Sequence, residues 1–348
     1  MIYTDDYWKE IKKNIKNITN YKKLFNKSLL ITGSTGMICS AVVDFLLYLN
    51  KFEDAKIRIY LAGRSKEKAK KRFYPFQESE DYYFVLYDAE RYQLLNYKID
   101  YVIHGASNAN PTLYSKYPVE TLFGNVIGIK SILDSALKNN WKRVLYISSS
   151  EIYGKKKESK LFNEDDYEYV DILNPRACYP NSKRISETIC ASYRNEYSID
   201  SVIVRPGHIY GHTMTKSDTR ASSEFARNSM NGLDIIMKSE GTQLRSYCFV
   251  YDCVTAIITV LLNGKSGEAY NISNKKSIVT IKEVAEKFSE ISGVNLTFEV
   301  PTINEKKGYN LMNNSALDSE KIELLGWKGI YDLNTGVGKT LQFLKLMS

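Results

Sequence analysis

Short apolar runs alternate with longer amphipathic stretches between residues 28 and 207. The runs predict strands at residues 29–31, 56–64, 82–88, 99–107, 142–150 and 200–207. Between them apolar side chains recur at helical spacing, and the two longest stretches, 119–140 and 175–197, predict long helices. Strands that alternate with helices pair in parallel, so the pattern predicts an α/β fold with a doubly wound Rossmann-type parallel sheet.

The chain on either side of this region predicts two further parts. Residues 5–26 place apolar side chains at near-helical spacing, so we predict an N-terminal helical extension over 1–27. After residue 206 the pattern predicts a strand and helix within 248–264 and helices within 277–293, 317–329 and 333–347. We predict a dinucleotide-binding Rossmann domain over 28–205, joined by about 246–264. A smaller C-terminal substrate-binding lobe is predicted from residues 206–245 and 265–348, over the carboxyl ends of the strands.

Composition narrows the class of protein. The 348 residues are 43% hydrophobic and 25% charged, as in ordinary globular proteins. No apolar run approaches the roughly 20 residues that span a bilayer, and the polar N-terminal stretch does not resemble a secretory signal. The cysteines are odd in number, scattered and without metal-ligand spacing: Cys39, Cys178, Cys190, Cys248 and Cys253. We therefore predict a cytoplasmic protein with reduced thiols, no membrane partner and no metal site.

The net charge of +8 has two interpretations. It could attract an anionic partner, such as nucleic acid, a membrane surface or a phosphate-bearing small molecule. It could also reflect lysine-rich solvated faces, because the basic residues are spread along the whole chain. No nucleic-acid recognition motif accompanies the charge, so we expect no nucleic-acid partner.

The first stretch with candidate chemistry is ITGSTGMIC, residues 31–39, which follows a strand and opens a helix. Gly33 and Gly36 match the first two glycines of a dinucleotide fingerprint, where the backbone approaches a pyrophosphate at a helix N-terminus. Cys39 stands at the third glycine position, and its small side chain can be tolerated there. The turn residues predicted to bind the cofactor are Gly33, Ser34, Thr35, Gly36, Met37 and Ile38.

The end of the second strand bears on the choice between NAD and NADP. Arg64 and Ser65 stand where an acid would read the ribose of NAD, which favours the 2′-phosphate of NADP. The same residues could simply be the exposed start of a helix. Asp88, after the third strand, could accept a hydrogen bond from the adenine amine or be an ordinary turn aspartate.

The most specific signal is CYPNSKR, in which Tyr179 and Lys183 are four residues apart and share one helix face. An ammonium beside a phenol lowers the pKa of the phenol, so Tyr179 could take a proton from a sugar hydroxyl. His104, at the end of a strand, is better interpreted as a local backbone partner than as a catalytic group.

With these residues in place, the chain resembles the extended short-chain dehydrogenase/reductases, the NAD(P)-dependent nucleotide-sugar epimerases, 4,6-dehydratases and decarboxylases. The resemblance covers nearly all of residues 28–330 and is carried by TGSTGMI, HGASNA, NVIGIKSIL, SSSEIYG, YPNSK, RPGHIYG, RSYCFVYD, GEAYNISN and LGW. It implies a catalytic triad of Ser149, Tyr179 and Lys183, with Lys183 also on the nicotinamide ribose and Asn125 supporting the site. Further cofactor contacts are expected from Asp88, Ala89, Ala106, Ser107 and Ser148. The resemblance also implies a nucleoside-diphosphate sugar as substrate and a homodimer formed through the two long helices.

The reaction depends on Glu151, which decarboxylases and GDP-mannose 4,6-dehydratases share and simple 4-epimerases usually lack. dTDP-glucose dehydratases keep an acid where Ser150 stands. The arginine that decarboxylases carry shortly before LGW is absent here, where Asn313 and Asn314 occur, so decarboxylation loses its obvious cationic partner.

Three residues are expected on the substrate: Ser150, His208 and Arg245. His208 replaces an asparagine of most relatives, and His212 replaces a proline after Gly211. Arg245 matches a position that binds the substrate diphosphate, with a surface salt bridge as the alternative.

We therefore predict first a 4,6-dehydratase, in which Tyr179 and Ser149 act at C4 and Glu151 takes the C5 proton. The alternatives are a 4-epimerase, a 4-keto reductase, a UDP-glucuronate decarboxylase and a non-catalytic NAD(P)-binding scaffold. The sugar, the nucleotide base and the role of the N-terminal helix stay open.

Overall fold

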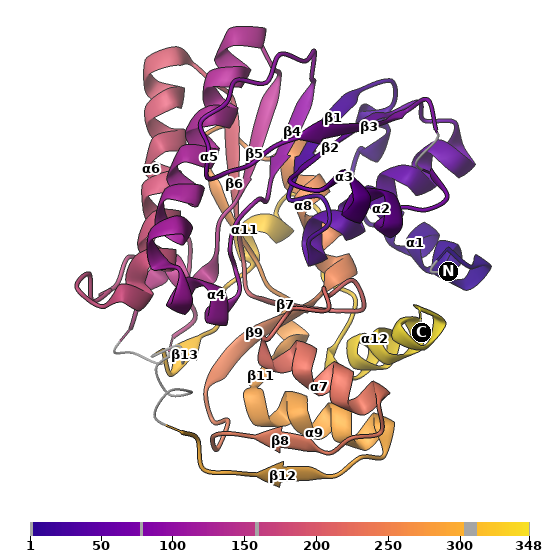
Figure 1. Ribbon diagram of the computed structural model, residues 1–348, viewed down its shortest axis with the longest axis vertical. Helices are drawn as coiled ribbons and strands as arrows, with labels where there is room; N and C mark the ends of the chain where they lie inside the picture. The colour runs from indigo at the N-terminus through magenta and orange to yellow at the C-terminus, as the bar shows by residue number, and fades with distance from the viewer. Residues whose placement is uncertain (1–2, 77–78, 157–159, 303–311, 348) are drawn as a thin grey trace.

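A computed structural model describes residues 3–76, 79–156, 160–302 and 312–347. Figure 1 shows a large sheet flanked by helices, and a smaller lobe below it. The sheet is parallel, in the order β10-β6-β5-β4-β1-β2-β3. Its strands are β1 (Ser28–Thr32), β2 (Arg58–Gly63), β3 (Tyr82–Leu86), β4 (Tyr101–His104), β5 (Arg143–Ile147), β6 (Ser201–Pro206) and β10 (Ala269–Ile272). The predicted Rossmann-type α/β fold is confirmed.

Helices cover both faces of this sheet. One face carries α2 (Met37–Glu53) and α8 (Val250–Asn263), and the other carries α5 (Pro118–Asn139) and α6 (Cys178–Tyr197). In β1, Leu29 and Ile31 join the core beneath α2 and α8, whereas Leu30 joins the core beneath α5. Alternate side chains of a strand point to opposite faces, so a central strand covered on both sides is apolar at every such position.

The lobe is built around β9 (Leu244–Phe249), which pairs with β7 (His208–Tyr210), β11 (Ile278–Thr280) and β13 (Asn314–Ser315). A second pair joins β8 (Ile235–Met237) to β12 (Leu296–Phe298). Three helices pack on these strands: α7 (Ala221–Met230), α9 (Ile281–Ser292) and α12 (Leu333–Met347). The start of α9 is fixed by a capping box between Thr280 and Glu283.

Four details differ from the sequence prediction. Strand β10 lies in the large sheet although residues 265–348 were assigned to the lobe, and β9 lies in the lobe sheet although 246–264 was joined to the Rossmann domain. The helix predicted over 5–26 ends at Ile15, and a separate 3₁₀ turn, Tyr21–Leu24, follows after Asn20, which has φ of 63°. The helix predicted within 317–329 is one turn, α11 (Glu320–Glu323), after which Gly326 has φ of 88°. Positions 1–2, 303–311 and 348 of the predicted extension and lobe lie outside the described residues.

The shorter helices complete the large part: α3 (Lys66–Arg72), after β2, and α4 (Pro111–Lys116), before α5. Throughout the described ranges, every helix is too short or too polar to cross a bilayer.

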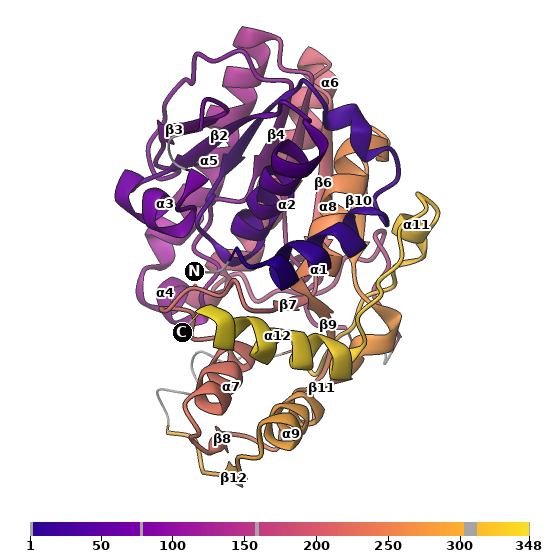
Figure 2. The ribbon, with the colours of Figure 1, turned by 90° about the vertical axis from the view of Figure 1, so that its right-hand side faces the viewer.

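The N-terminal helix α1 (Asp5–Ile15) connects the two parts of the subunit, and Figure 2 shows it above α12. On the sheet side, Tyr7 donates a hydrogen bond to the buried Asp44 carboxylate at 2.6 Å, and Arg72 donates to the same carboxylate at 3.1 Å. On the lobe side, Glu10 accepts a hydrogen bond from Tyr331 and pairs with Lys339 at 2.6 Å. The helix therefore binds both parts through polar groups as well as apolar ones.

We predict that Arg72→Ala destabilises the protein by about 3–5 kcal/mol, because it leaves the Asp44 carboxylate buried without its cation. Chemical denaturation followed by circular dichroism measures the free energy of unfolding. Lys9→Ala is the control, since the Lys9–Asp6 pair is exposed and contributes less than about 1 kcal/mol. Equal losses in the two variants would refute the role of the buried pair.

Candidate active site

The predicted cofactor turn follows β1 at the carboxyl edge of the large sheet. Gly33 has φ of +67°, and a Cβ added there would lie 2.9 Å from the Gly105 carbonyl oxygen. Gly36 precedes α2 as its N-cap and provides no side-chain cap, which leaves the first N–H groups of the helix open to an anion. The Cys39 sulfur packs against Gly105, so the missing third glycine is compensated by a glycine on the neighbouring strand end.

Neighbouring strand ends present further polar atoms. Thr32 Oγ1 hydrogen-bonds to His104 Nδ1 at 2.7 Å and accepts from the Gly105 and Ala106 N–H groups at 3.1 Å. Burial and then the Lys183 charge lower the pKa of His104 to about 3. The partner of His104 is a side-chain hydroxyl on the neighbouring strand, whereas the sequence predicted a local backbone partner. Among the described residues, the buried hydroxyls of Ser107 and Ser148 have no hydrogen-bond partner. These open donors and the glycine turn fit a dinucleotide.

The residues predicted at the adenosine end are close together. Ser65 caps α3 by accepting from the Lys68 N–H group at 3.2 Å. Arg64 is mostly exposed and lies 3.7 Å from Glu90, whose N–H group donates to Asp88 at 3.2 Å. Asp88 therefore stabilises a local turn, which was the alternative to an adenine contact. Ala89, the next residue, packs near Gly128. The contact with adenine stays a prediction.

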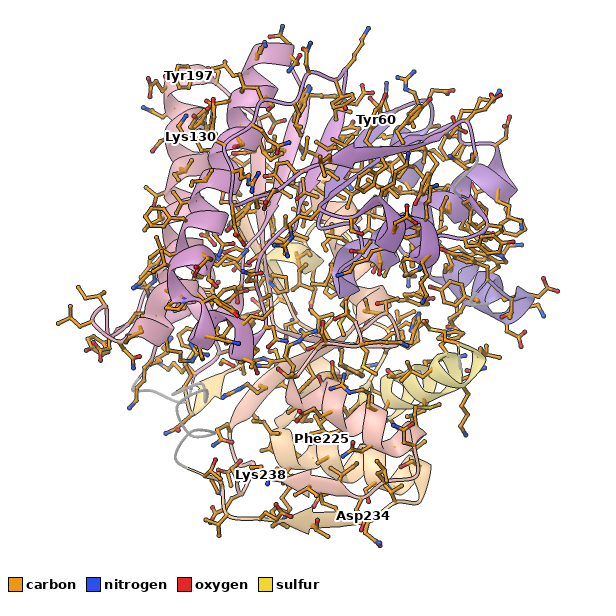
Figure 3. All side chains as sticks on the ribbon, in the orientation of Figure 1. Tyr60, Lys130, Tyr197, Phe225, Asp234 and Lys238 are labelled. Atoms are coloured by element: carbon orange, nitrogen blue, oxygen red, sulfur yellow. The ribbon has the colours of Figure 1, made fainter. Side chains whose placement is uncertain are left out.

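Two elements position the proposed triad. Ser149 follows β5, and Tyr179 and Lys183 lie in the first turns of α6, at the end nearer the lobe. Figure 3 shows Tyr197, at the other end of α6, far from the lobe residue Phe225. Lys183 Nζ donates to the Ile147 carbonyl at 2.8 Å and lies 5.8 Å from the centre of the Tyr179 ring.

Asn125, on α5, holds the start of α6. Its side-chain amide donates to Ser182 Oγ at 3.0 Å, and Ser182 donates to the Tyr179 carbonyl at 2.9 Å. Asn125 is buried, and its supporting role in the site stays a prediction.

The pKa values of the triad depart from the sequence argument. Burial, followed by the charge of Glu151, raises the pKa of Tyr179 to about 12, although a hydrogen bond with Ser149 opposes the shift. Burial lowers the pKa of Lys183 to about 7. The sequence argument considered only the ammonium beside the phenol, whereas desolvation disfavours the charged form of both groups.

Glu151 forms an ion pair that the sequence analysis missed. Arg176 Nη1 donates to Glu151 Oε2 at 2.8 Å, and Nη2 donates to Oε1 at 3.0 Å. Tyr114, on α4, accepts from Arg176 Nη2 at 3.1 Å, and its ring stacks on Tyr179 with centroids 5.1 Å apart. Arg176 could have been suspected because it precedes Tyr179 by three residues, whereas no sequence pattern marks Tyr114.

The substrate side of the site is rich in arginine. Arg245 is buried on β9 and donates to the Leu244 and Met312 carbonyls at 2.9 and 2.8 Å, which excludes the surface salt bridge. Arg220, another residue that the sequence analysis missed, is bound to Asp218 at 2.6 Å. Arg220 also lies 3.3 Å from the Met37 sulfur of the cofactor turn.

The remaining predicted residues separate into two groups. His208 lies on β7 near Tyr247, and its Nδ1 is buried without a partner among the described residues. Burial, Arg245 and Arg220 lower the pKa of His208 to about 3. Ser150 is buried in the 3₁₀ turn that contains Glu151. His212 instead lies in the core, 3.4 Å from the Tyr7 hydroxyl.

Over the ranges that the structure describes, no three His, Cys, Asp or Glu side chains are grouped so that they could hold a metal.

Comparison with known proteins places the chain. Residues 29–273 match the NAD dependent epimerase/dehydratase family, and the chain belongs to that family. It is 31% identical to UDP-glucuronic acid decarboxylase 3 of Arabidopsis thaliana, over 90% of this chain and 87% of the relative. It is 26% identical to the dTDP-D-glucose 4,6-dehydratase of Mus musculus, over 92% of this chain and 89% of the relative. The predicted relationship to nucleotide-sugar decarboxylases, dehydratases and epimerases is thus confirmed.

Solved structures share the fold. The UDP-glucose 4-epimerase of Thermotoga maritima, with UDP-glucose, has a TM-score of 0.78 at 19% identity, covering 92% of this chain and 99% of that one. The dTDP-glucose 4,6-dehydratase of Bacillus anthracis, in complex with NAD, has a TM-score of 0.76 at 21% identity, covering 92% and 97%.

We predict that Gly33→Ala weakens NAD and NADP binding at least about tenfold, because the added Cβ meets Gly105 and the backbone has a positive φ. Isothermal titration calorimetry measures the affinity. Gly338→Ala, in α12, is the control, because a Cβ there meets nothing within 4 Å. Unchanged cofactor affinity in Gly33→Ala would contradict the assignment of the turn.

Proposed function

We propose that the protein is an NAD(P)-dependent decarboxylase of a nucleoside-diphosphate hexuronate, which acts through transient oxidation at C4. The observation that carries this choice is the bidentate ion pair between Glu151 and Arg176 beside Tyr179. The coarser activity, nucleotide-sugar chemistry with a bound dinucleotide, is supported by the relatives at 26–31% identity.

The protein groups have distinct roles at C4. Ser149 holds the C4 hydroxyl, and Tyr179, as phenolate, accepts its proton while Lys183 binds the ribose of the cofactor. The nicotinamide, when bound, supplies an acceptor for the C4 hydride and later returns it. The 4-keto sugar is a β-keto acid, so the electrons of the C5–C6 bond pass into the C4 carbonyl as carbon dioxide leaves. Protonation at C5 and restoration of the C4 hydroxyl, with the proton from Tyr179, give a nucleoside-diphosphate pentose.

The ion pair favours this outcome over loss of water. Dehydration needs Glu151 as a base toward the C5 proton and an acid for the leaving hydroxyl. The Glu151 carboxylate is held by two charge-assisted hydrogen bonds from Arg176 and would have to give them up before it could act on a C5 proton. Ser150 stands where relatives keep the acid. Decarboxylation needs neither group, since the C4 ketone takes the electrons.

Positive charge from other elements offsets the arginine that is missing before LGW. Arg176 and Arg220 both lower the pKa of Tyr179, so both guanidinium groups are near the reacting phenol. Arg245 lies within electrostatic range of Glu151 and Arg176 and is suited to the substrate diphosphate. The sequence ranked decarboxylation below dehydration for want of a cation. Arg176 and Arg220 are paired with Glu151 and Asp218, so Arg245, whose hydrogen bonds go to backbone carbonyls, is the cation of the three that weakens this objection.

A 4,6-dehydratase is the second candidate, and the position of Glu151 favours it. The charge of this carboxylate raises the pKa of Tyr179, which places it close to the phenol. It could reach the C5 proton only after leaving Arg176.

The preference for NADP, which depends on Arg64 and Ser65, and the homodimer through α5 and α6 also remain proposals. Phe123 and Ile185 are exposed on those helices, with 51% and 44% of their surface accessible.

Product analysis tests the reaction. We expect the protein to convert a nucleoside-diphosphate glucuronate, from a panel of glucuronates and hexoses with NAD and NADP, into a product lighter by one carbon dioxide. Mass spectrometry measures this. A hexose product lighter by one water would establish the dehydratase instead, and an unchanged mass with inverted C4 would establish an epimerase.

Tyr179→Phe separates catalysis from cofactor binding within the same experiment. It should lower the rate by about 10²–10⁴-fold and leave cofactor affinity unchanged. If neither the unsubstituted protein nor Tyr179→Phe converts any substrate of the panel, the result would favour the non-catalytic NAD(P)-binding scaffold.

The pH dependence tests the environment of Tyr179. Its pKa is raised to about 12, so the rate of C4 oxidation should rise as the pH rises and the phenolate becomes populated. Glu151→Gln removes a charge that raises this pKa, so the rising limb should move to lower pH. The rate of cofactor absorbance change in a single turnover measures the profile. Asp134→Asn, on α5 beside Lys130, is the matched control, and a Glu151→Gln profile that does not move would contradict the coupling.

A further inference from the structure

The pair between Glu151 and Arg176 sets the charge of one end of the sugar site. Ser149 accepts a hydrogen bond from the Glu151 N–H group at 3.2 Å, so Glu151 lies in the same turn, two residues after the residue expected to hold the C4 hydroxyl. C6 of a hexose is two bonds from C4. A carboxylate at C6 would therefore approach the Glu151 side chain, and two unpaired carboxylates at such a distance repel.

We propose that Arg176 is a specificity-determining residue that admits a sugar carboxylate by neutralising Glu151. With Arg176 in place the two side chains carry no net charge, and Arg245 adds a positive charge within electrostatic range. Without Arg176, Glu151 would present a bare anion to C6, which a neutral hexose tolerates and a hexuronate does not. The inference rests on the proposed function, because it places C6 of the substrate near Glu151.

Two contacts fix the arginine in this role. Tyr114 accepts from Arg176 Nη2, and the guanidinium lies 5.2 Å from the centre of the Tyr114 ring, which itself stacks on Tyr179. The cation is thereby held at a set position relative to the reacting phenol. Side-chain exposures of 13% for Arg176 and 16% for Glu151 leave little solvent to screen the pair.

An unused donor on the same side chain supports a ligand at this place. Arg176 Nε is buried, and no hydrogen-bond partner for it occurs among the described residues. A buried guanidinium donor without an acceptor is costly, and an oxygen of the substrate would satisfy it. This observation is independent of the Glu151 pair, and the proposal assigns an acceptor oxygen of the substrate to this donor.

Binding of two probes that differ at C6 tests the inference. The affinities of UDP-glucuronate and UDP-glucose are measured by calorimetry with NAD present, and the ratio of the two affinities is compared among variants. The ratio is the affinity for UDP-glucuronate divided by the affinity for UDP-glucose. Arg176→Gln should lower this ratio at least about tenfold. The double variant Glu151→Gln/Arg176→Gln removes both charges and should return the ratio to within about threefold of the original. Arg176→Lys keeps the charge and should retain most of the preference.

A matched ion pair away from the site is the control. Arg143→Gln removes the cation of the Arg143–Asp200 pair, whose atoms are 2.8 Å apart at the opposite end of β5, and should leave the ratio unchanged. Cofactor affinity and the circular dichroism spectrum verify that each variant is folded. An equal loss of both probes in Arg176→Gln, or a double variant as poor as Arg176→Gln, would overturn the inference.

This experiment and the product analysis fail in different ways. Binding requires no turnover, so a protein that removes water from hexoses would refute the proposed decarboxylation and leave the affinity ratios to decide the role of Arg176. Conversely, carbon dioxide release with an unchanged ratio in Arg176→Gln would uphold the reaction and reject the inference.

Discussion

The hydrogen bond from Lys183 to the carbonyl of Ile147 fixes the geometry on which the site depends. It joins the first turns of α6 to the last residue of β5, and thus sets Tyr179 against the serines that follow that strand. The ammonium is buried, and the cost appears as the lowered pKa of Lys183. The ring of Tyr146, 4.8 Å away, offsets part of that cost through a cation–π contact. Asn125 and Ser182 hold the same turn from the side of α5.

Charge is distributed around this centre in pairs. Glu151 is bound by Arg176 and Asp218 by Arg220, so each acid near the phenol has its own arginine. Arg245 differs, since its hydrogen bonds go to backbone carbonyls, and the role proposed for it on the substrate diphosphate would use its positive charge. Neutral pairs near the sugar and a free positive charge further away would orient an anionic nucleotide without repelling charge at the sugar itself.

The sequence predicted those parts of the fold that local pattern determines. The apolar run Leu29–Ile31 and the helical spacing of 119–140 identify strand and helix without any partner. Sheet membership is different, because β9 and β10 are both short strands of mixed polarity, and only tertiary pairing assigns them to separate sheets.

The site shows the same division between local pattern and tertiary contact. Tyr179 and Lys183 are found from spacing within one helix, whereas Tyr114 reaches Glu151 across 37 residues of sequence and carries no local mark. The sequence argument also predicted the wrong direction for the pKa shift of Tyr179, because burial, which raises this pKa, is a property of the folded chain.

The helix α1 has a consequence for the order of assembly. Its Glu10 is satisfied by Tyr331 and Lys339, which are synthesised more than 300 residues later. During translation the apolar face of α1 can settle on α2, but its carboxylate must stay hydrated until α12 arrives. Helix α1 is therefore synthesised before α2 but completes its contacts only after the chain has reached Lys339, when the lobe has formed.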